Sequence, residues 1–222
     1  MFILSRGCDA ADVASSAHNI CIIFCPAPFM RQPPIALIVA ALLPDLGIGY
    51  GGALPWRLKQ EIKYFRDVTS NAPDGSINAV IMGRRTWESI PPRFRPLPNR
   101  INVVLSRSNP NLEENDVFWG NSFDTALEFL QKRHDINKIF VIGGAEIYNQ
   151  VINDPRISHL LLTEVSANND ATIPMDRFLH FPREAWTRSP HLQLLQFTGI
   201  DATDSTIKEG DFSYNYSLWC KK

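Results

Sequence analysis

Short apolar segments alternate with amphipathic ones along most of this chain, and this alternation limits its possible fold more than any other feature. The apolar segments contain few polar residues, so both faces of the strands they form are buried, as in parallel sheets. The amphipathic segments repeat apolar residues every three or four positions, as helices do. The pattern predicts strands at 35–42, 78–83, 101–106, 116–119, 138–144 and 159–165, and helices at 57–69, 122–133 and 145–152, with Ser122 as the N-cap of the second helix. It therefore predicts a three-layer α/β fold with a central, mostly parallel sheet and helices on both faces.

The C-terminal part of the chain has a different pattern. "LQLLQFTG" (192–199) and "SYNYSLWCKK" (213–222) are both predicted as strands, and the polar stretch 200–211 separates them without a helical pattern. Two consecutive strands of this kind indicate an antiparallel hairpin at one edge of the sheet. With these two strands the predicted sheet has eight strands, and its C-terminal strand is antiparallel.

The charges of the chain nearly cancel, which bears on the partners it can attract. Lys and Arg total 22 and Asp and Glu total 23 among 222 residues, for a formal net charge of −1. Such a chain has no overall field that attracts nucleic acid or an anionic membrane surface, so any anion must be held by a local cluster. Its apolar runs are also shorter than a membrane span. We therefore expect neither nucleic acid nor a membrane as a partner.

The cysteines favour a reducing compartment. Three of the four fall in the first segment, at Cys8, Cys21 and Cys25, and only Cys220 lies elsewhere. This arrangement matches neither a disulfide framework nor the spacing of a metal site. An intracellular location is the simplest interpretation.

Residues 1–33 differ from the rest of the chain. They contain two short apolar patches and the acids Asp9 and Asp12, which fits neither a secretory signal nor an acid-poor transit peptide. We interpret them as a disordered extension or as the product of an upstream start codon, because Met30 stands just before the folded pattern. The prediction is a single folded domain at 34–222.

One acid in the first predicted helix, Glu61 in "GALPWRLKQEIKYFRDVT" (52–69), is in an unusual position. It lies on the apolar stripe formed by Leu58, Ile62, Phe65 and Thr69. An acid in such a place usually turns outward or pairs with a nearby base, here Lys59 or Lys63, and position alone favours that interpretation. The alternative is a carboxylate that faces a binding pocket, where burial favours its neutral form.

The first glycine cluster resembles a dinucleotide-binding fingerprint but lies in the wrong context. "GIGYGG" (47–52) matches G-x-G-x-x-G, and Asp67 lies at about the distance of a ribose-binding acid. A Rossmann turn leads directly from strand to helix, whereas here Pro44 and Pro55 interrupt on either side and Asp67 falls within a helix. We interpret 44–55 as a mobile glycine-rich loop able to close over a ligand, with an ordinary turn as the alternative.

The second glycine cluster, Gly143-Gly144, stands between a predicted strand and a predicted helix. Bare backbone at such a turn can approach a phosphate at the helix N-terminus, although a tight packing turn would use the same residues. The two interpretations are about equally supported by the sequence.

Basic and hydroxyl residues follow the ends of two predicted parallel strands. Arg84, Arg85 and Thr86 come after the second strand, and Ser106 and Arg107 after the third. Ligands of parallel sheets bind at the carboxyl edge, and two converging basic groups suit the additional phosphate of NADP. Solvated surface charge is the alternative for any one of these residues.

The longest motifs resemble the dihydrofolate reductase family, in particular its fungal branch. They are "VAALLPDLGIGYGGALPWRLKQEIKYF", "VIMGRRTWESIPPRFRPLPNRINVVLSR", "FVIGGAEIYNQVI", "LLLTEV" and "KEGDFSYNYSLW", which occur in family order between Pro34 and Lys222. The resemblance implies NADPH-dependent reduction of 7,8-dihydrofolate to tetrahydrofolate, which supplies one-carbon metabolism and thymidylate, purine and glycine synthesis. The alternatives are a folate-binding protein without turnover and a Rossmann NAD dehydrogenase.

The resemblance also implies site residues. Catalysis would rest on Glu61, supported by Thr163 and by Leu54 and Trp56, which close the site. Binding of the substrate would involve Ala40, Glu61, Ile62, Phe65, Ile90, Leu97, Arg100, Ile142 and Tyr148. Binding of the cofactor would involve Ala40, Ile48, Gly52, Gly83, Arg84, Arg85, Thr86, Ser89, Leu105, Ser106, Arg107, Ser122, Gly143, Gly144, Ala145, Glu146, Ile147 and Tyr148, with a cis Gly143–Gly144 bond.

From the same resemblance we expect dihydrofolate and antifolate inhibitors as ligands, no metal, a monomeric state and a cytoplasmic location, with a mitochondrial or nuclear pool left open. Ala53 departs from the family, since many relatives carry a polar or basic residue there. This departure concerns the rate at which the loop closes and leaves the chemistry untouched.

Overall fold

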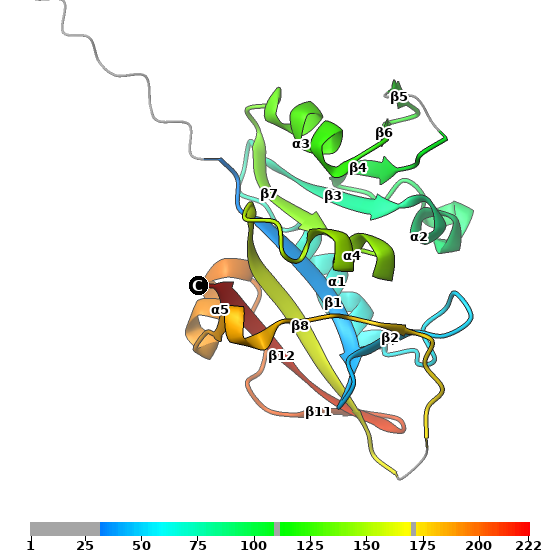
Figure 1. The fold of residues 1–222 in the computed structure, drawn as a ribbon. Coiled ribbons are helices and arrows are strands. Elements are labelled where there is room, and N and C mark those ends of the chain that lie inside the picture. Colours follow the sequence, from blue (N-terminus) through cyan, green and yellow to red (C-terminus); the bar gives the residue numbers. More distant parts are fainter. Residues whose placement is uncertain (1–31, 109–111, 170–171) are drawn as a thin grey trace, which may run out of the picture. The chain divides into compact units, whose positions relative to one another are not determined.

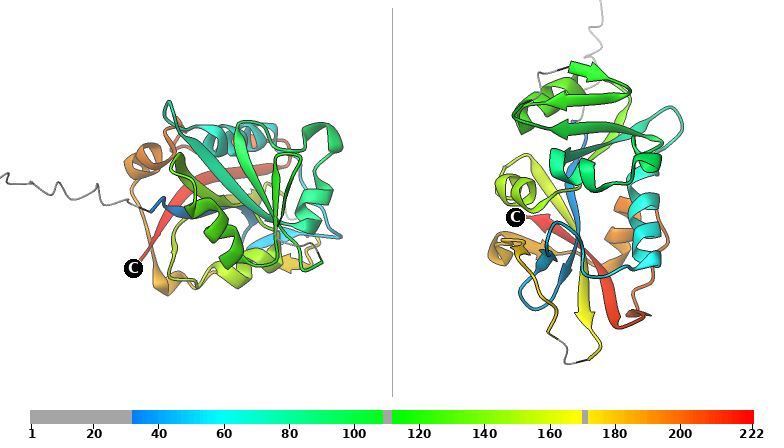
Figure 2. Two further views of the ribbon diagram at one scale, coloured as in Figure 1. Left: turned by 90° about the horizontal axis from the view of Figure 1, so that it is seen from above. Right: turned by 90° about the vertical axis from the view of Figure 1, so that its right-hand side faces the viewer.

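The computed structural model describes residues 32–108, 112–169 and 172–222 (Figure 1). Within these residues a single 12-stranded sheet carries helices on both faces, as the two views of Figure 2 show. The expectation for residues 1–33 lies almost wholly outside the described part of the chain, as do Cys8, Cys21 and Cys25. The α/β architecture predicted from the alternating pattern is confirmed.

The sheet runs in the order β10-β12-β8-β1-β7-β3-β4-β6-β5. Its long strands are β1 (Ile35–Leu42), β3 (Ile77–Gly83), β4 (Arg100–Leu105), β6 (Val117–Gly120), β7 (Ile136–Val141), β8 (Ile157–Ala167) and β12 (Phe212–Lys221). Every neighbouring pair from β8 to β6 is parallel. β12 is antiparallel to β8 over its whole length, from Phe212 opposite Ala167 to Cys220 opposite His159. The direction of the predicted C-terminal strand is therefore correct.

Short strands make the sheet larger than the eight strands expected. They are β2 (Gly47–Gly49), β5 (Leu112–Glu114), β9 (Arg177–Phe178), β10 (Trp186–Arg188) and β11 (Ile207–Glu209). Segments of two or three residues are too short to show a period-two pattern, and their backbone pairing depends on partners far away in the sequence.

The helices pack on two separate apolar cores. α3 (Phe123–Gln131) and α4 (Ala145–Val151) cover one face, and α1 (Lys59–Ser70) and α5 (His191–Thr198) cover the other. Successive side chains of a strand point to opposite faces, so Leu37 and Val39 join the first core while Ala36 and Ile38 join the second. The remaining helical segments are α2 (Arg84–Ser89) and the short 3-10 turns Pro92–Phe94 and Arg183–Ala185.

The predicted cap of the second helix is confirmed. Ser122 precedes α3, and its hydroxyl accepts a hydrogen bond of 3.1 Å from the backbone N–H of Thr125. The Thr125 hydroxyl in turn accepts from the backbone N–H of Ser122. The reciprocal pair satisfies two groups that the start of a helix leaves without intrahelical partners.

The prediction of a strand at 192–199 is wrong, because this segment is helix α5. Leu192 is 64% exposed and Leu194 is 1% exposed, whereas a strand would place both on one face. Pro190 precedes the helix, and Gly199 ends it in the left-handed conformation with φ 67°. A Pro before and a Gly after a short segment are helix signals that the apolar run concealed.

The hairpin at the C-terminus therefore has different strands from those expected. β11, not the segment at 192–199, pairs with β12, through Ile207 opposite Tyr214 and Glu209 opposite Phe212. β12 is also not an edge strand along its length, because β10 pairs with its C-terminal part.

Two further findings concern classes of protein. In the part of the chain that the structure describes, no helix is long and apolar enough to cross a membrane. Over the same residues, no group of three or more His, Cys, Asp or Glu side chains is placed to hold a metal ion.

Candidate active site

Two of the side chains proposed from the sequence, Glu61 of α1 and Thr163 of β8, come together on the face of the sheet that α1 covers. Thr163 of β8 lies opposite Ala40 of β1 in the sheet register. The Thr163 hydroxyl reaches a carboxylate oxygen of Glu61, on the first turn of α1, at 3.5 Å. The structure thus brings together an acid and a hydroxyl that are 102 residues apart in the sequence.

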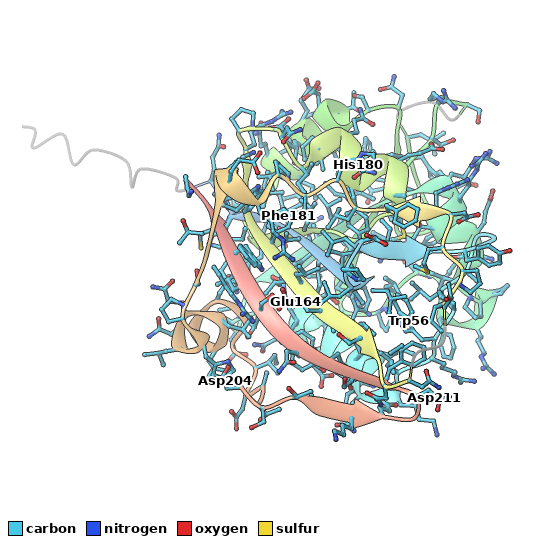
Figure 3. All side chains as sticks on the ribbon, turned by 60° about the horizontal axis from the view of Figure 1, so that its bottom comes forward. Trp56, Glu164, His180, Phe181, Asp204 and Asp211 are labelled. Atoms are coloured by element: carbon cyan, nitrogen blue, oxygen red, sulfur yellow. The ribbon has the colours of Figure 1, made fainter. Side chains whose placement is uncertain are left out.

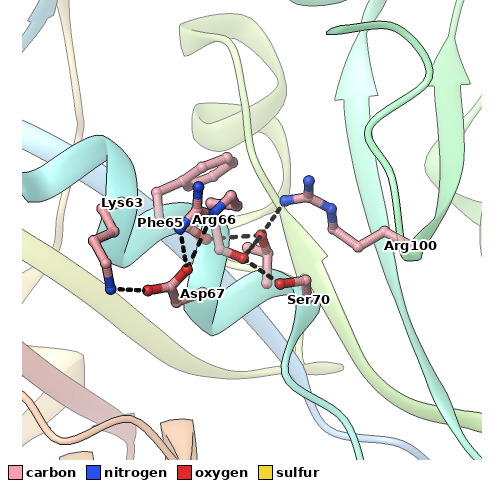
Figure 4. Close-up of polar contacts among 7 residues, drawn as sticks. Lys63, Phe65, Arg66, Asp67, Ser70 and Arg100 are labelled. Carbon is pink, nitrogen blue, oxygen red and sulfur yellow. Dashed lines mark hydrogen bonds and ion pairs between the residues drawn. The ribbon is translucent and has the colours of Figure 1, made fainter. Parts of the chain in front are cut away.

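Glu61 is partly buried and its carboxyl titrates abnormally. Burial raises its pKa from 4.5 to about 7, the hydrogen bond from Thr163 opposes this shift, and the charge of Glu209 adds to it. Lys63 pairs with Asp67 instead (Figure 4), and no ion pair reaches Glu61 within the described residues. The interpretation in which Lys59 or Lys63 neutralises Glu61 is therefore wrong, and the carboxyl is available to a ligand.

The apolar stripe predicted around Glu61 is only partly correct. Leu58 and Thr69 are buried, whereas the Ile62 side chain is 53% exposed. The buried positions of α1 itself are Tyr64, Val68 and Thr69. The helix is rotated so that this set faces the sheet, which leaves Ile62 free for contact with a ligand and places Glu61 at the boundary between core and solvent.

Aromatic side chains form the protein wall behind Glu61. Tyr64 stacks on Tyr216 of β12 with ring centroids 3.8 Å apart. The Trp56 and Phe212 rings are tilted against each other, with centroids 6.0 Å apart. Figure 3 shows Trp56 and Asp211 at the same end of the sheet. The Trp56 indole N–H and the Tyr64 hydroxyl are buried without a hydrogen-bond partner among the described residues. Buried polar groups are nearly always paired, so ordered water or a ligand is expected to reach them.

Arg100 is a buried cation at the start of β4. It is 7% exposed, and its guanidinium donates to the Thr69 hydroxyl at 2.6 Å (Figure 4) and to the Pro98 carbonyl at 3.0 Å. Burial, followed by the charge of Arg66, lowers its pKa to about 10, so it remains charged at neutral pH. None of the ion pairs in the described residues includes Arg100. A buried charge without a counter-ion is costly, and a ligand carboxylate would compensate it.

The Gly143–Gly144 turn is tightly packed, and its peptide bond is cis. Gly143 has φ +104°, and a Cβ on it would lie 2.7 Å from the ring of Tyr148, so a larger residue is excluded. The Tyr148 hydroxyl is buried and donates to the Ile38 carbonyl at 2.6 Å. Gly83 at the end of β3 donates its N–H to the Gly143 carbonyl at 2.7 Å. The turn therefore joins the ends of two neighbouring strands.

The basic residues after β3 and β4 lie at the same edge but are exposed. Arg84 pairs with Glu88 at 3.0 Å, and Arg85 approaches Glu146 at 3.7 Å with 79% of its side chain exposed. Arg107 is likewise exposed, whereas Ser106 is buried and donates its backbone N–H to Gly120. The register, with Gly83 opposite Leu105 and Leu105 opposite Gly120, brings these strand ends together.

The glycine-rich segment 44–55 is not a Rossmann turn. It contains β2, which pairs with β1 and with β9, and Tyr50 forms an isolated bridge with Ala53. Ile48 lies in β2, and Gly52 has φ +84°, in the region that favours glycine. The segment leads from β1 to Trp56 and α1, as the family resemblance implies.

The other predicted site residues are only partly buried or exposed. Ser122 uses its hydroxyl to cap α3, and the Ser89 hydroxyl donates to the Thr86 carbonyl. Partly buried are Ala40, Phe65, Ile90, Leu97, Ile142, Ala145 and Ile147, while Leu54 and Glu146 are exposed.

The sequence interpretation missed Glu209, Tyr214 and Tyr216 as neighbours of the first turn of α1. No local pattern identifies them, since they come from the C-terminal hairpin. Two cavities of about 410 and 380 Å³ lie elsewhere, one beside α5 and β12 and one beside the β2–β9 pair. Neither is lined by Glu61 or Arg100, so neither of these two cavities marks the proposed site.

Comparison with known proteins identifies relatives over most of the chain. The family model "Dihydrofolate reductase" matches residues 34–193. A dihydrofolate reductase of Candida albicans is 50% identical over 195 residues, covering 87% of this chain and 100% of that protein. That of Saccharomyces cerevisiae is 39% identical, covering 85% and 97%. The solved structure of Schistosoma mansoni dihydrofolate reductase superposes with a TM-score of 0.69 at 26% identity, covering 86% and 100%.

Proposed function

The chain belongs to the dihydrofolate reductase family, and we propose that it reduces 7,8-dihydrofolate to tetrahydrofolate with NADPH as the hydride donor. Its relatives are enzymes of that name, so the reduction of dihydrofolate rests on the family as a whole. The choice of NADPH, the roles of individual residues and the monomeric state are our proposals. The observation that carries the proposed reduction of the pterin is the Glu61 carboxyl, which is held by Thr163, has a pKa near neutrality and has no cationic partner within the described residues.

In this proposal Glu61 binds and polarises the pterin ring. Its carboxylate accepts hydrogen bonds from the 2-amino group and the adjacent ring nitrogen, while the Thr163 hydroxyl fixes its orientation. When bound, a nicotinamide cofactor would supply the hydride that pterin C6 accepts, while N5 would take a proton from water. Since an N5-protonated iminium accepts hydride far better than a neutral imine, a group that favours protonation of the ring accelerates the transfer.

Arg100 binds the glutamate carboxylate of the substrate. The guanidinium is already desolvated and oriented by its bonds to Thr69 and Pro98, so little additional order is needed when the ligand arrives. A charge-assisted, two-point contact of this kind also fixes the distance between the substrate tail and the pterin.

The remaining substrate contacts are apolar and enclose the pterin and aminobenzoyl rings. Exposed Leu54 and Ile62 are suited to covering a ligand, since a large apolar side chain in water gains from such contact. The proposed set is Ala40, Leu54, Trp56, Ile62, Phe65, Ile90, Leu97, Ile142 and Tyr148.

The cofactor is proposed to lie along the carboxyl ends of β3, β4, β6 and β7. Arg85, Arg107, Thr86 and Ser106 would hold the adenosine phosphate, and the Gly143–Gly144 turn the pyrophosphate. The assignment is supported by Gly144, which stands without a side chain at the N-cap of α4, whereas Gly143 is required by its close packing against Tyr148. The remaining proposed contacts are Ala40, Ile48, Gly52, Gly83, Arg84, Ser89, Leu105, Ser122, Ala145, Glu146, Ile147 and Tyr148.

The deciding experiment measures oxidation of NADPH when dihydrofolate is added, with NADH as the matched cofactor control. We expect rapid turnover with NADPH, much slower turnover with NADH at equal concentration, and inhibition by methotrexate. Binding of dihydrofolate without oxidation of NADPH would favour a folate-binding protein. Preference for NADH together with indifference to methotrexate would defeat the proposal entirely.

A further inference from the structure

The first turn of α1, which carries Glu61, is capped by a residue from the other end of the chain. Leu58 at the N-cap position has no side-chain bond to the helix. The carboxylate of Glu209 accepts hydrogen bonds from the backbone N–H groups of Lys59 and, at 3.2 Å, of Gln60. Glu209 belongs to β11 and lies 150 residues further along the sequence than Lys59. The tertiary fold therefore supplies the cap that the local sequence lacks.

The contacts of Glu209 keep it ionised. Burial alone would raise its pKa, but the bonds from Lys59 and Gln60, the Tyr214 hydroxyl and the charge of Lys59 together lower the pKa below its usual value. The Tyr214 hydroxyl donates to the second carboxylate oxygen at 3.0 Å. An anion at a helix N-terminus is further favoured by the helix dipole. Glu209 is therefore a fixed negative charge at neutral pH.

Aromatic rings connect the neighbourhood of the Glu209 carboxylate with that of Glu61. Tyr214 packs edge-on against Tyr216 at 5.7 Å, and Tyr216 stacks on Tyr64 at 3.8 Å. All three rings are buried. Fields between charges are screened less through such material than through solvent.

From this geometry we propose that Glu209 is a positioning residue of the active site, which caps α1 and holds a permanent negative charge beside the Glu61 carboxyl. Glu209 is not one of the proposed binding residues. It therefore acts through Glu61 and through the position of α1, the helix that it caps. Its negative charge opposes the ionisation of the Glu61 carboxyl in the free enzyme, whereas the hydrogen-bond donors of a bound pterin favour the carboxylate.

The other groups that face Glu61 do not provide such a charge. They are Thr163 of β8, Tyr64 of α1, Tyr148 of α4 and Tyr216 of β12. Burial raises the pKa of each of the three tyrosines well above its usual value, so all are neutral in the working range. Of the groups that face Glu61 in the described part of the chain, only Glu209 carries a full charge. Its charge is therefore the one that raises the pKa of the Glu61 carboxyl.

The test uses variants that separate the charge from the cap. Glu209→Gln retains an acceptor oxygen for the helix but removes the charge. Glu209→Asp retains the charge on a shorter side chain. Asp211→Asn is the matched control, because it removes one negative charge two residues away, from an exposed side chain that forms no ion pair or hydrogen bond with α1 in the described part of the chain.

The measurement is the titration of the Glu61 carboxyl in the free enzyme by carbon-13 NMR, with the signal assigned through its loss in Glu61→Gln. Glu209→Gln is expected to lower the Glu61 midpoint by about 0.5 to 1 pH unit. Glu209→Asp and Asp211→Asn are expected to leave it within about 0.3 unit. The midpoint in the pH dependence of kcat/KM, which reports groups of the free enzyme, should move in the same direction.

A merely structural cap would lower the melting temperature without moving the Glu61 midpoint. Equal midpoints for wild type and Glu209→Gln, or an equal shift in Asp211→Asn, would overturn the proposal. The inference concerns the enzyme proposed above and rests on the role of Glu61 there. The proposed role of Glu61 and the influence of Glu209 fail in different ways. Full activity of Glu61→Gln would contradict the role of Glu61. The NMR titration tests the influence of Glu209 whether or not the enzyme turns over.

Discussion

The two halves of the proposed site use their charges in opposite ways. On the substrate side, Glu61 and Arg100 are partly or almost fully buried, and neither has a counter-ion among the described residues. On the cofactor side, Arg84 and Arg85 are exposed, and each approaches an acid of its own. A buried, uncompensated charge changes its energy greatly when a ligand arrives, whereas an exposed one already interacts with water.

The difference indicates how each half obtains its specificity. In the proposed site, a few costly, preorganised groups would select the substrate, and removing one of them should weaken binding or catalysis strongly. Several weak contacts would hold the cofactor phosphate, and each of them should be individually dispensable. Arg100 lies at the amino end of β4, whereas Arg84 and Arg85 follow the carboxyl end of β3, so the two halves differ in position as well as in burial.

The largest effect is expected from Glu61→Gln, which keeps the shape but cannot ionise. Single-turnover hydride transfer at neutral pH should slow by tens to hundreds-fold, about 2 to 4 kcal/mol, with NADPH binding unchanged. Low pH should partly restore the rate, because solvent protons then supply the N5-protonated substrate. If the Glu61→Gln variant transferred hydride at the wild-type rate at neutral pH, Glu61 would have no catalytic role and would be only an acid at the border of the core.

Arg100→Ala should weaken folate and methotrexate by about 2 to 3 kcal/mol, since it removes a charge-assisted contact to their carboxylate. Trimethoprim-like inhibitors lack that carboxylate and serve as the control ligand. Dissociation constants from fluorescence titration compare the two classes. If both weakened equally, Arg100 would be a structural residue of β4 and not a ligand for the substrate tail.

The stability of the protein should depend on the ionisation of Glu61. Its folded pKa of about 7 lies above the usual 4.5, so the folded state binds more protons between these values. The free energy of unfolding should therefore fall as pH rises from 4.5 to about 7, by on the order of 1 to 3 kcal/mol from this group. Urea unfolding of Glu61→Gln should lack this component, and identical pH profiles for variant and wild type would contradict the assignment.

Replacement of Arg85 or Arg107 by Ala should have a smaller effect, about 1 kcal/mol in NADPH binding, because these side chains are exposed. NADH is the matched control, since it lacks the additional phosphate and should bind equally well to wild type and variants. The NADPH loss should diminish at high salt. Equal losses for both cofactors would exclude contact with that phosphate.

The smallest effect is expected from removing residues 1–29, so that the chain begins at Met30. Turnover and melting temperature should both stay unchanged, since the segment shows no pattern able to join the core. A melting temperature lowered by several degrees would mean that the segment contributes at least about 1 kcal/mol to folding.

Much of the framework was predictable because it depends on local physical chemistry. The predicted β1 has the same bounds, 35–42, as the strand in the structure, since continuous apolar residues can only be buried on both faces. Ser122 caps α3 as expected, because its hydroxyl reaches an N–H three residues away. The residues around Glu61 and Arg100 were suggested by the family resemblance, and their roles stay predictions.

Other features were decided only by tertiary structure, because they depend on partners that the local sequence does not contain. The segment 192–199 is predicted as a strand but forms helix α5. Its short apolar run fits both the helical and the strand period, and only the packing exposes Leu192 and buries Leu194. Ile62 belongs to the apolar stripe by spacing, yet the packing of Tyr64 and Val68 on the sheet turns it outward. The cap of α1 by Glu209 joins residues 150 apart. The sequence by itself determines which segments can form strands and helices, whereas burial and long-range contacts determine which charges the site holds and how strongly.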